Sequence, residues 1–146
     1  MSDAMVPHPI IVDFAVALLV VSVAFDLLAS IVEERDLRVV SWWTLLLGTV
    51  AAALAVVSGF AAARLAGNDS PVVETIAWHR NLGIVTLACF AACTLWRLRW
   101  PASFPERFRD LYWALTAIGL GALLVTAYFG GILVFRLGVG FQPPTP

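Results

Sequence analysis

The sequence predicts an all-α integral membrane protein, a four-helix bundle whose helices run alternately up and down. Of its 146 residues, 61% are hydrophobic and only 13% are charged, and the mean hydropathy is +0.90. A soluble fold of this composition would leave too much apolar surface in water. Four apolar segments are each long enough for a helix to cross about 30 Å of hydrocarbon. The connections between them are short, which favours antiparallel neighbours.

The whole chain, residues 1–146, is predicted to form a single transmembrane domain. In order, its spans cover about residues 10–32, 39–65, 76–98 and 111–135. Each is expected to be a regular helix, because unpaired backbone amides are too costly in lipid. Pro9 suits the first turn of the first helix, with His8 as the flanking residue. Ser70-Pro71 gives the third helix an earlier start, with Ser70 as its cap.

The arginines predict the orientation. The first and third connections, with the helix ends beside them, carry six arginines, whereas the opposite face carries three. The six are Arg35, Arg38, Arg97, Arg99, Arg107 and Arg109, and the three are Arg64, Arg80 and Arg136. Because cytoplasmic loops are enriched in positive side chains, we expect both termini outside. The net charge of −1 gives no indication of nucleic-acid binding, and the bilayer itself is the expected partner.

The two histidines of the chain, His8 and His79, form the candidate site. On this topology both fall at the same membrane face, at the heads of two helices that run in the same direction. Imidazole is a common metal ligand and binds haem iron. We therefore predict a b-type haem between the first and third helices near the periplasmic face, with the two histidines as axial ligands.

Glycines and arginines at the same level support this prediction. Gly83 follows His79 by four residues, so the two share a helix face and the glycine leaves room beside the imidazole. Gly130-Gly131 lies near the same level on the fourth helix. Arginines at this face can pair with the carboxylates of haem propionates. These arginines are Arg64, Arg80 and Arg136.

Other interpretations of these residues stay open at this point. Histidines at helix ends are often only hydrogen-bonded, glycines in membrane helices serve packing, and terminal arginines extend to the interface. Asp13 could complete a set of two histidines and one carboxylate with His8 and His79, which suits non-haem iron or another divalent metal. It could equally orient a histidine through a hydrogen bond. The alternatives are therefore haem, a divalent metal, or no cofactor.

The remaining polar residues of the spans are interpreted as structural. Asp26 is expected to form an ion pair with Arg97 or Arg99, or a hydrogen bond to a neighbouring helix. Cys89 and Cys93 share a face of the third helix, where their geometry is poor for a disulfide, so they are expected to pack. Because no nucleophile–base pair or phosphate loop is recognisable, a redox carrier or an accessory subunit is favoured over a stand-alone enzyme.

Two motifs resemble the DUF2231 family of predicted bacterial membrane proteins. Residues 8–18 read HPIIVDFAVAL, similar to the opening motif of that family, and residues 130–140 read GGILVFRLGVG, similar to its Gly-Gly-containing ending. Trp43 and His79-Arg80 also fit the family pattern. The resemblance covers nearly the whole chain and implies a bacterial inner-membrane protein similar to small haem-bearing cytochrome b domains, sometimes found with Rieske-type modules.

The chain departs from the family pattern at two places. Family members often have His-Phe-Pro where this chain has Asp13-Phe14-Ala15, so a carboxylate replaces one potential ligand, and a Tyr is common where Phe135 stands. His8 and His79 are retained. The expected function is electron transfer between a quinol, or a membrane subunit of a respiratory or redox complex, and a periplasmic acceptor. The alternatives are a cofactor-free accessory subunit and a divalent-metal-binding protein.

Overall fold

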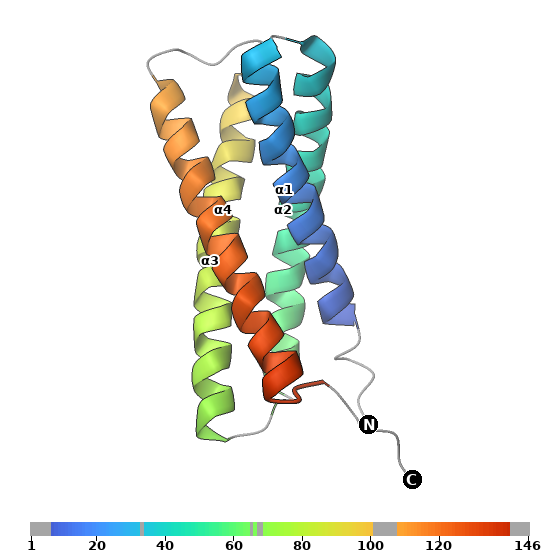
Figure 1. Cartoon of the computed structure of the whole chain (residues 1–146), viewed down its shortest axis with the longest axis vertical. Coiled ribbons are helices and arrows are strands. Elements are labelled where there is room, and N and C mark those ends of the chain that lie inside the picture. The colour runs from blue at the N-terminus through green and yellow to red at the C-terminus, as the bar shows by residue number, and fades with distance from the viewer. Residues whose placement is uncertain (1–6, 33, 65, 67–68, 101–107, 141–146) are drawn as a thin grey trace.

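The computed structural model describes residues 7–32, 34–64, 66, 69–100 and 108–140. Four long helices run alternately up and down the long axis of the molecule (Figure 1). They are α1 (Pro7–Val32), α2 (Arg35–Ala63), α3 (Ser70–Arg99) and α4 (Arg109–Gly131), and a π-helical turn, η3 (Ile132–Arg136), continues α4. Each of the four is long and apolar enough to cross a membrane. The prediction of an all-α membrane bundle is confirmed.

The helix starts differ in detail from the sequence-based expectations. Helix α1 begins at Pro7, so His8 lies inside the first turn and does not flank it. Helix α3 begins at Ser70 as expected, but its N-cap residue is Asp69, whose backbone carbonyl accepts hydrogen bonds from the amides of Val72 and Val73. The predicted Ser70 cap was therefore wrong by one residue, because the start of the helix is stabilised through the backbone and no side chain caps it.

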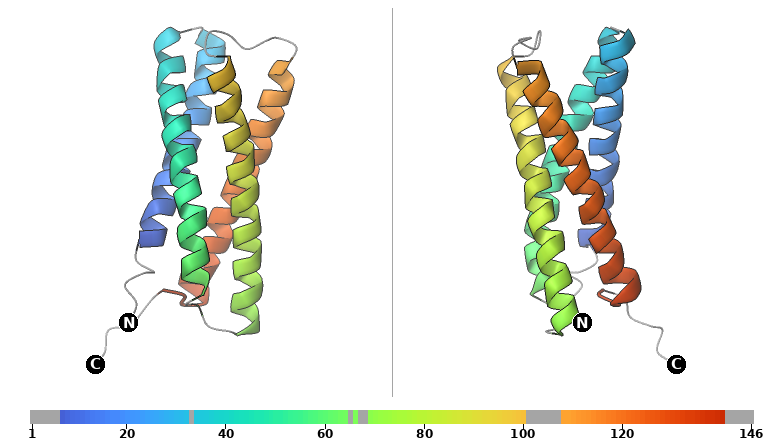
Figure 2. Two further views of the ribbon diagram at one scale, coloured as in Figure 1. Left: turned by 180° about the vertical axis from the view of Figure 1, so that it is seen from behind. Right: turned by 60° about the vertical axis from the view of Figure 1, so that its left-hand side comes forward.

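The helices pack as two hairpins, α1 against α2 and α3 against α4 (Figure 2). Helices α2 and α3 join the hairpins along one side, whereas α1 and α4 contact each other least. Helices α1 and α3 lie diagonally across the bundle and do not pack directly in the described part of the chain. The core between the hairpins is centred on Leu19, Leu45 and Phe90, which are almost fully buried.

Two glycines let neighbouring helices approach closely. A Cβ at Gly48 of α2 would lie 2.9 Å from a methyl group of Leu19 on α1. A Cβ at Gly119 of α4 would lie 2.9 Å from the Cβ of Cys89 and 3.1 Å from the ring of Phe90 on α3. Small residues at membrane helix interfaces allow this kind of backbone approach. Cys89 thus has the packing role that the sequence predicted, and Gly48 and Gly119 leave the space for close contact.

The substitution Gly119→Ala is expected to destabilise the α3–α4 hairpin by about 1–3 kcal/mol, because the added methyl group overlaps with buried atoms. Gly121→Ala on the same helix is the matched control, since a Cβ there meets nothing within 4 Å. Reversible unfolding of the detergent-solubilised variants measures both. Equal stability of the two variants would contradict the close packing at Gly119.

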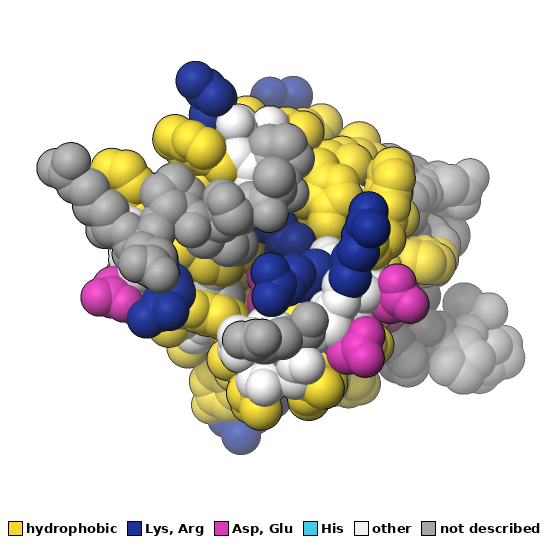
Figure 3. Space-filling model, turned by 90° about the horizontal axis from the view of Figure 1, so that it is seen from above, with side chains coloured by type: hydrophobic (Ala, Val, Ile, Leu, Met, Phe, Trp, Pro, Cys, Tyr) yellow, Lys and Arg dark blue, Asp and Glu magenta, His cyan; other side chains and the backbone are white. Residues whose placement is uncertain are grey.

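The two ends of the bundle differ in character. The histidine end, which carries His8 and His79, is formed by the starts of α1 and α3 and by the ends of α2 and α4. The arginine end is the opposite end, where α1 and α3 end and α2 and α4 begin. Viewed onto the arginine end, basic side chains gather near the middle of the face (Figure 3). The described arginines of this end are Arg35, Arg38, Arg97, Arg99 and Arg109; Arg107 lies outside the described residues.

The π-helical turn η3 was not predicted from the sequence. The amide of Leu137 donates to the carbonyl of Ile132 at 3.0 Å, and the amide of Val139 donates to that of Leu133 at 2.8 Å. Gly138 follows with a φ of 65°, a left-handed conformation that favours glycine. Single π turns within helices frequently occur at functional sites. Here the turn lies at the histidine end and its residues border the cavity described next.

Candidate functional site: a histidine pair in the bundle cavity

His8 and His79 meet across the diagonal of the bundle. His8 comes from the first turn of α1 and His79 from the third turn of α3. Their ring centroids are 6.2 Å apart and their planes are inclined by 84°. Since the backbones of α1 and α3 do not pack against each other, the two imidazoles extend toward one another from opposite sides. The structure therefore brings the two predicted ligands together.

A hydrogen bond holds the Nδ1 atom of each imidazole. The Nδ1 atom of His79 lies 2.9 Å from the backbone carbonyl of Thr126, which can only accept, so Nδ1 carries the proton. His8 Nδ1 lies 2.9 Å from the Ser58 hydroxyl. When that hydroxyl donates to the carbonyl of Ala55, 3.1 Å away, it accepts from His8 Nδ1. In neutral imidazoles this arrangement leaves the lone pair on each Nε2.

A glycine lies directly against each histidine. A Cβ at Gly59 would fall 3.0 Å from Cε1 of His8, and a Cβ at Gly130 would fall 3.2 Å from Cε1 of His79. A side chain at either position would press on the imidazole. Gly83, expected beside His79, would instead approach only Thr126, at 3.8 Å. Sequence reasoning therefore placed Gly130 at the correct level, but it did not identify Gly59 as a neighbour of His8.

The histidines line a cavity of about 820 Å³ that is formed by all four helices and η3. Most of its walls are apolar, and many of the lining residues are alanine or glycine, including Gly83, Gly130 and Gly131. Cavities of a few hundred to about 1,000 Å³ with apolar walls and a few convergent polar groups are typical of small-molecule and cofactor sites. Of the described residues that line it, four are ionisable, namely His8, Asp13, His79 and Arg80.

The three predicted arginines are not equivalent. Arg80 lines the cavity, and its guanidinium lies 6.0 Å from the ring centroid of Phe60. All three arginines are exposed, but Arg64 and Arg136 do not line the cavity. Arg64 is the C-cap residue of α2, and Arg136 is the last residue of η3. Only Arg80 is therefore placed to meet a ligand in the cavity.

Asp13 lines the same cavity but is exposed. Within the described residues, no group of three or more His, Cys, Asp or Glu side chains is arranged to hold a metal ion. The suggested set of His8, Asp13 and His79 is thus not assembled in this structure. The reason lies in helix geometry: five residues along α1 turn Asp13 well away from the direction of His8.

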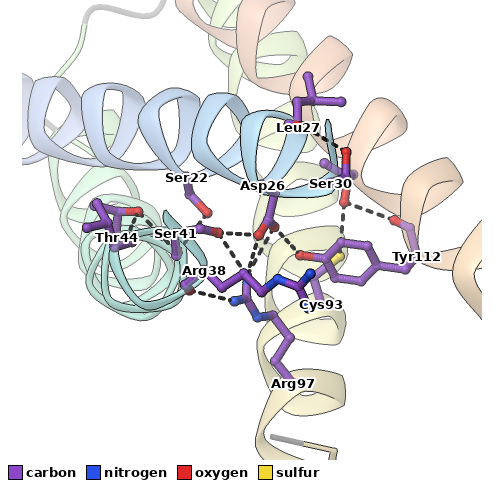
Figure 4. Close-up of polar contacts among 12 residues, drawn as sticks. Ser22, Asp26, Leu27, Ser30, Arg38, Ser41, Thr44, Cys93, Arg97 and Tyr112 are labelled. Carbon is purple, nitrogen blue, oxygen red and sulfur yellow. Dashed lines mark hydrogen bonds and ion pairs between the residues drawn. The ribbon is translucent and has the colours of Figure 1, made fainter. Parts of the chain in front are cut away.

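Asp26 lies outside this cavity, at the arginine end. Its carboxylate forms an ion pair with Arg97 at 2.8 Å, in which both side chains are about nine-tenths buried. Arg97 also donates to the hydroxyl of Ser41 at 2.9 Å, and the Tyr112 hydroxyl donates to Asp26 at 2.6 Å. Ser41 donates to Asp26 as well. Each of the four helices contributes one residue to this cluster (Figure 4). The predicted pairing of Asp26 with Arg97 is confirmed.

The fold and the cavity define an integral membrane four-helix protein with a histidine pair between its diagonal helices. The chain belongs to the family described as predicted membrane protein (DUF2231), whose profile matches residues 6–143. This confirms the resemblance seen in the motifs at the start of α1 and at the end of α4. No curated protein and no solved structure matches the chain significantly.

Proposed function

We propose that this protein is a membrane electron carrier that holds a b-type haem in the cavity, with His8 and His79 as the axial ligands. The observation that carries the proposal is the histidine pair itself. The two ring centroids lie 6.2 Å apart, and the Nδ1 atom of each ring is held by a hydrogen bond to a neighbouring helix. Hydrogen bonding of the second ring nitrogen is the usual support of a metal-bound histidine.

The separation of the rings suits one metal atom between them. With metal–nitrogen bonds of roughly 2.0–2.1 Å, two imidazoles on opposite sides of a metal would have ring centroids about 6 Å apart. A bare divalent ion commonly needs four or more ligands, and no third acidic, thiol or imidazole side chain joins the pair within the described residues. A haem supplies four ligands of its own and needs only two from the protein. The donor set therefore favours haem.

Each of the surrounding groups has a definite role in this proposal. His8 and His79 bind the iron, while Ser58 and the Thr126 carbonyl keep their rings oriented. Gly59 and Gly130 leave the space that these rings occupy. Arg80 pairs with a propionate carboxylate. When bound, the haem supplies a one-electron ferric–ferrous couple, whose potential depends on axial ligands and burial.

The arginine distribution supports a bacterial inner-membrane location in which the histidine end faces the periplasm, with both termini on that side. A haem at this depth would exchange electrons with a periplasmic acceptor and with a donor in the membrane. The exposed apolar surface of the helices leaves room for other membrane subunits of a redox complex, beside the lipid.

Haem quantification of the purified protein tests the proposal. The chain is expressed with haem supply, purified in mild detergent, and analysed by the pyridine haemochrome method and by elemental analysis. The expected result is about one haem b and one iron per chain. A colourless, metal-free protein that assembles with a partner would overturn the proposal and support an accessory subunit. A divalent metal without a haem band would support the metal-binding alternative.

A further inference from the structure

The cavity is bordered by the weakest helix contact of the bundle. Helices α1 and α4 contact each other least, whereas the other neighbouring pairs pack closely. Exposed residues of α1 and of η3, which continues α4, also line the cavity and define this seam, namely Asp13 and Ala17 on α1 and Val134 and Phe135 in η3. Because all four helices are membrane spans, the surroundings of the seam are lipid. A molecule dissolved in the bilayer would therefore reach the cavity between these residues.

Asp13, which lies at this seam, is an acidic side chain within a membrane-spanning helix. It lies five residues after His8, about 7.5 Å further along the helix axis, and Ala17 shares its helix face. Within the described residues, the Asp13 carboxylate has no hydrogen bond or ion pair, and it is the only acidic side chain that lines the cavity. A carboxylate within a membrane span is costly and by default indicates a functional group. Here it is a free acceptor at the opening.

We propose that a membrane quinol is the electron donor, that its head group enters between α1 and α4, and that the Asp13 carboxylate accepts a hydrogen bond from its hydroxyl. The proposal rests on the electron-carrier function proposed above. A quinol is the class of electron donor that dissolves in lipid and also carries a hydroxyl group for a carboxylate acceptor.

The chemistry balances. Oxidation of one quinol to quinone breaks two O–H bonds and releases two electrons and two protons. A haem held by His8 and His79 would take these electrons one at a time and would pass each to a one-electron periplasmic acceptor. Asp13 takes the first proton and passes it to water at the histidine end, and the second proton follows the same route.

Reduction kinetics test the role of Asp13. Holoprotein in nanodiscs is reduced in a stopped-flow instrument by a short-chain quinol and, separately, by dithionite. Asp13→Asn keeps the size of the side chain but cannot accept the proton, so quinol reduction is expected to slow at least about tenfold. Haem content and dithionite reduction are expected to stay unchanged. Equal quinol rates in the two proteins, or no quinol reduction of a haem-loaded wild type, would overturn the inference while leaving the proposed function intact.

Photolabelling tests the access route without using the haem. An azido-quinone probe in the same nanodiscs is expected to label the seam residues of α1 and η3. Ala17→Trp is expected to reduce this labelling by at least about tenfold. Ala24→Trp is the control, because Ala24 lies two turns further along the same exposed side of α1 and does not line the cavity. The control variant should be labelled like the wild type. Labelling elsewhere, or equal labelling of both variants, overturns the inference even if the purified protein contains no haem.

Discussion

The substitution Asp26→Leu is expected to lower the free energy of unfolding by about 3–5 kcal/mol, because it leaves the buried Arg97 guanidinium without its counter-charge. Arg97 donates to both carboxylate oxygens of Asp26, at 2.8 and 3.0 Å. The Tyr112 hydroxyl also loses its acceptor on Asp26. The loss thus affects groups from all four helices, since Ser41 of α2 also donates to this carboxylate. Steric trapping or reversible denaturation in mixed micelles measures the effect.

Two further variants distinguish the loss of stability caused by breaking the ion pair from the loss caused by removing a carboxylate. The double variant Asp26→Leu/Arg97→Met removes both charges, and replacing a buried ion pair by apolar side chains is often close to neutral. It is expected to recover most of the lost stability. Asp13→Leu removes an exposed, unpaired carboxylate from the same helix and should cost less than about 1 kcal/mol. If Asp26→Leu is as stable as Asp13→Leu, the ion pair does not hold the helices together.

The substitutions His8→Ala and His79→Ala are each expected to reduce the haem content by at least about tenfold, since loss of even a supporting group around a metal ligand typically lowers affinity 10–100-fold. Pyridine haemochrome analysis of variants purified in parallel measures this. Circular dichroism and elution volume show whether the bundle itself is retained. Full haem content in either variant would exclude that histidine as an axial ligand.

A pair of adjacent glycines provides a finer test of the same site. Gly130→Ala places a methyl group 3.2 Å from Cε1 of His79, whereas Gly131→Ala places it in open space. The first variant is expected to bind less haem or to shift the absorption band, and the second to behave like the wild type. The opposite order would contradict the position of His79.

Much of the fold could be predicted because it depends on length and polarity alone. Each span contains a run of apolar residues that can only be helical in lipid. The pairing of Asp26 with Arg97 was predictable because few buried charges exist and opposite charges at equal depth combine. The approach of His8 and His79 was likewise predictable from depth, since both histidines lie near the start of helices that run in the same direction.

The rotation of each helix about its axis could not be predicted in the same way. Helix rotation decides that Gly130 contacts His79 while Gly83 does not, and that Arg64 does not line the cavity. These outcomes depend on side-chain packing between helices, which is only weakly encoded by polarity when every face is apolar. The hydrophobic pattern of a lipid-facing surface closely resembles that of the core.

Two residues beside His8, Ser58 and Gly59, could have been found from their depth in the membrane. Ser58 and Gly59 lie seven and six residues before the predicted end of the second span, about 10 Å from that membrane face. His79 lies about 5 Å inside the same face on its predicted span, so Ser58 and Gly59 fall within about one helical turn of its level. A hydroxyl beside a glycine at the depth of an imidazole indicates a hydrogen-bond partner with space next to it. The π-helical turn η3 carried no such signal beyond its neighbouring glycines.

Electron paramagnetic resonance of the oxidised, purified protein at low temperature tests haem binding by the histidine pair, because it reports the iron, its spin state and both axial ligands together. We expect a low-spin ferric haem signal with a strongly anisotropic g-tensor, since the planes of His8 and His79 are inclined by 84°. Loss of that signal in both His8→Ala and His79→Ala would complete the assignment. A spectrum without low-spin ferric haem would contradict it.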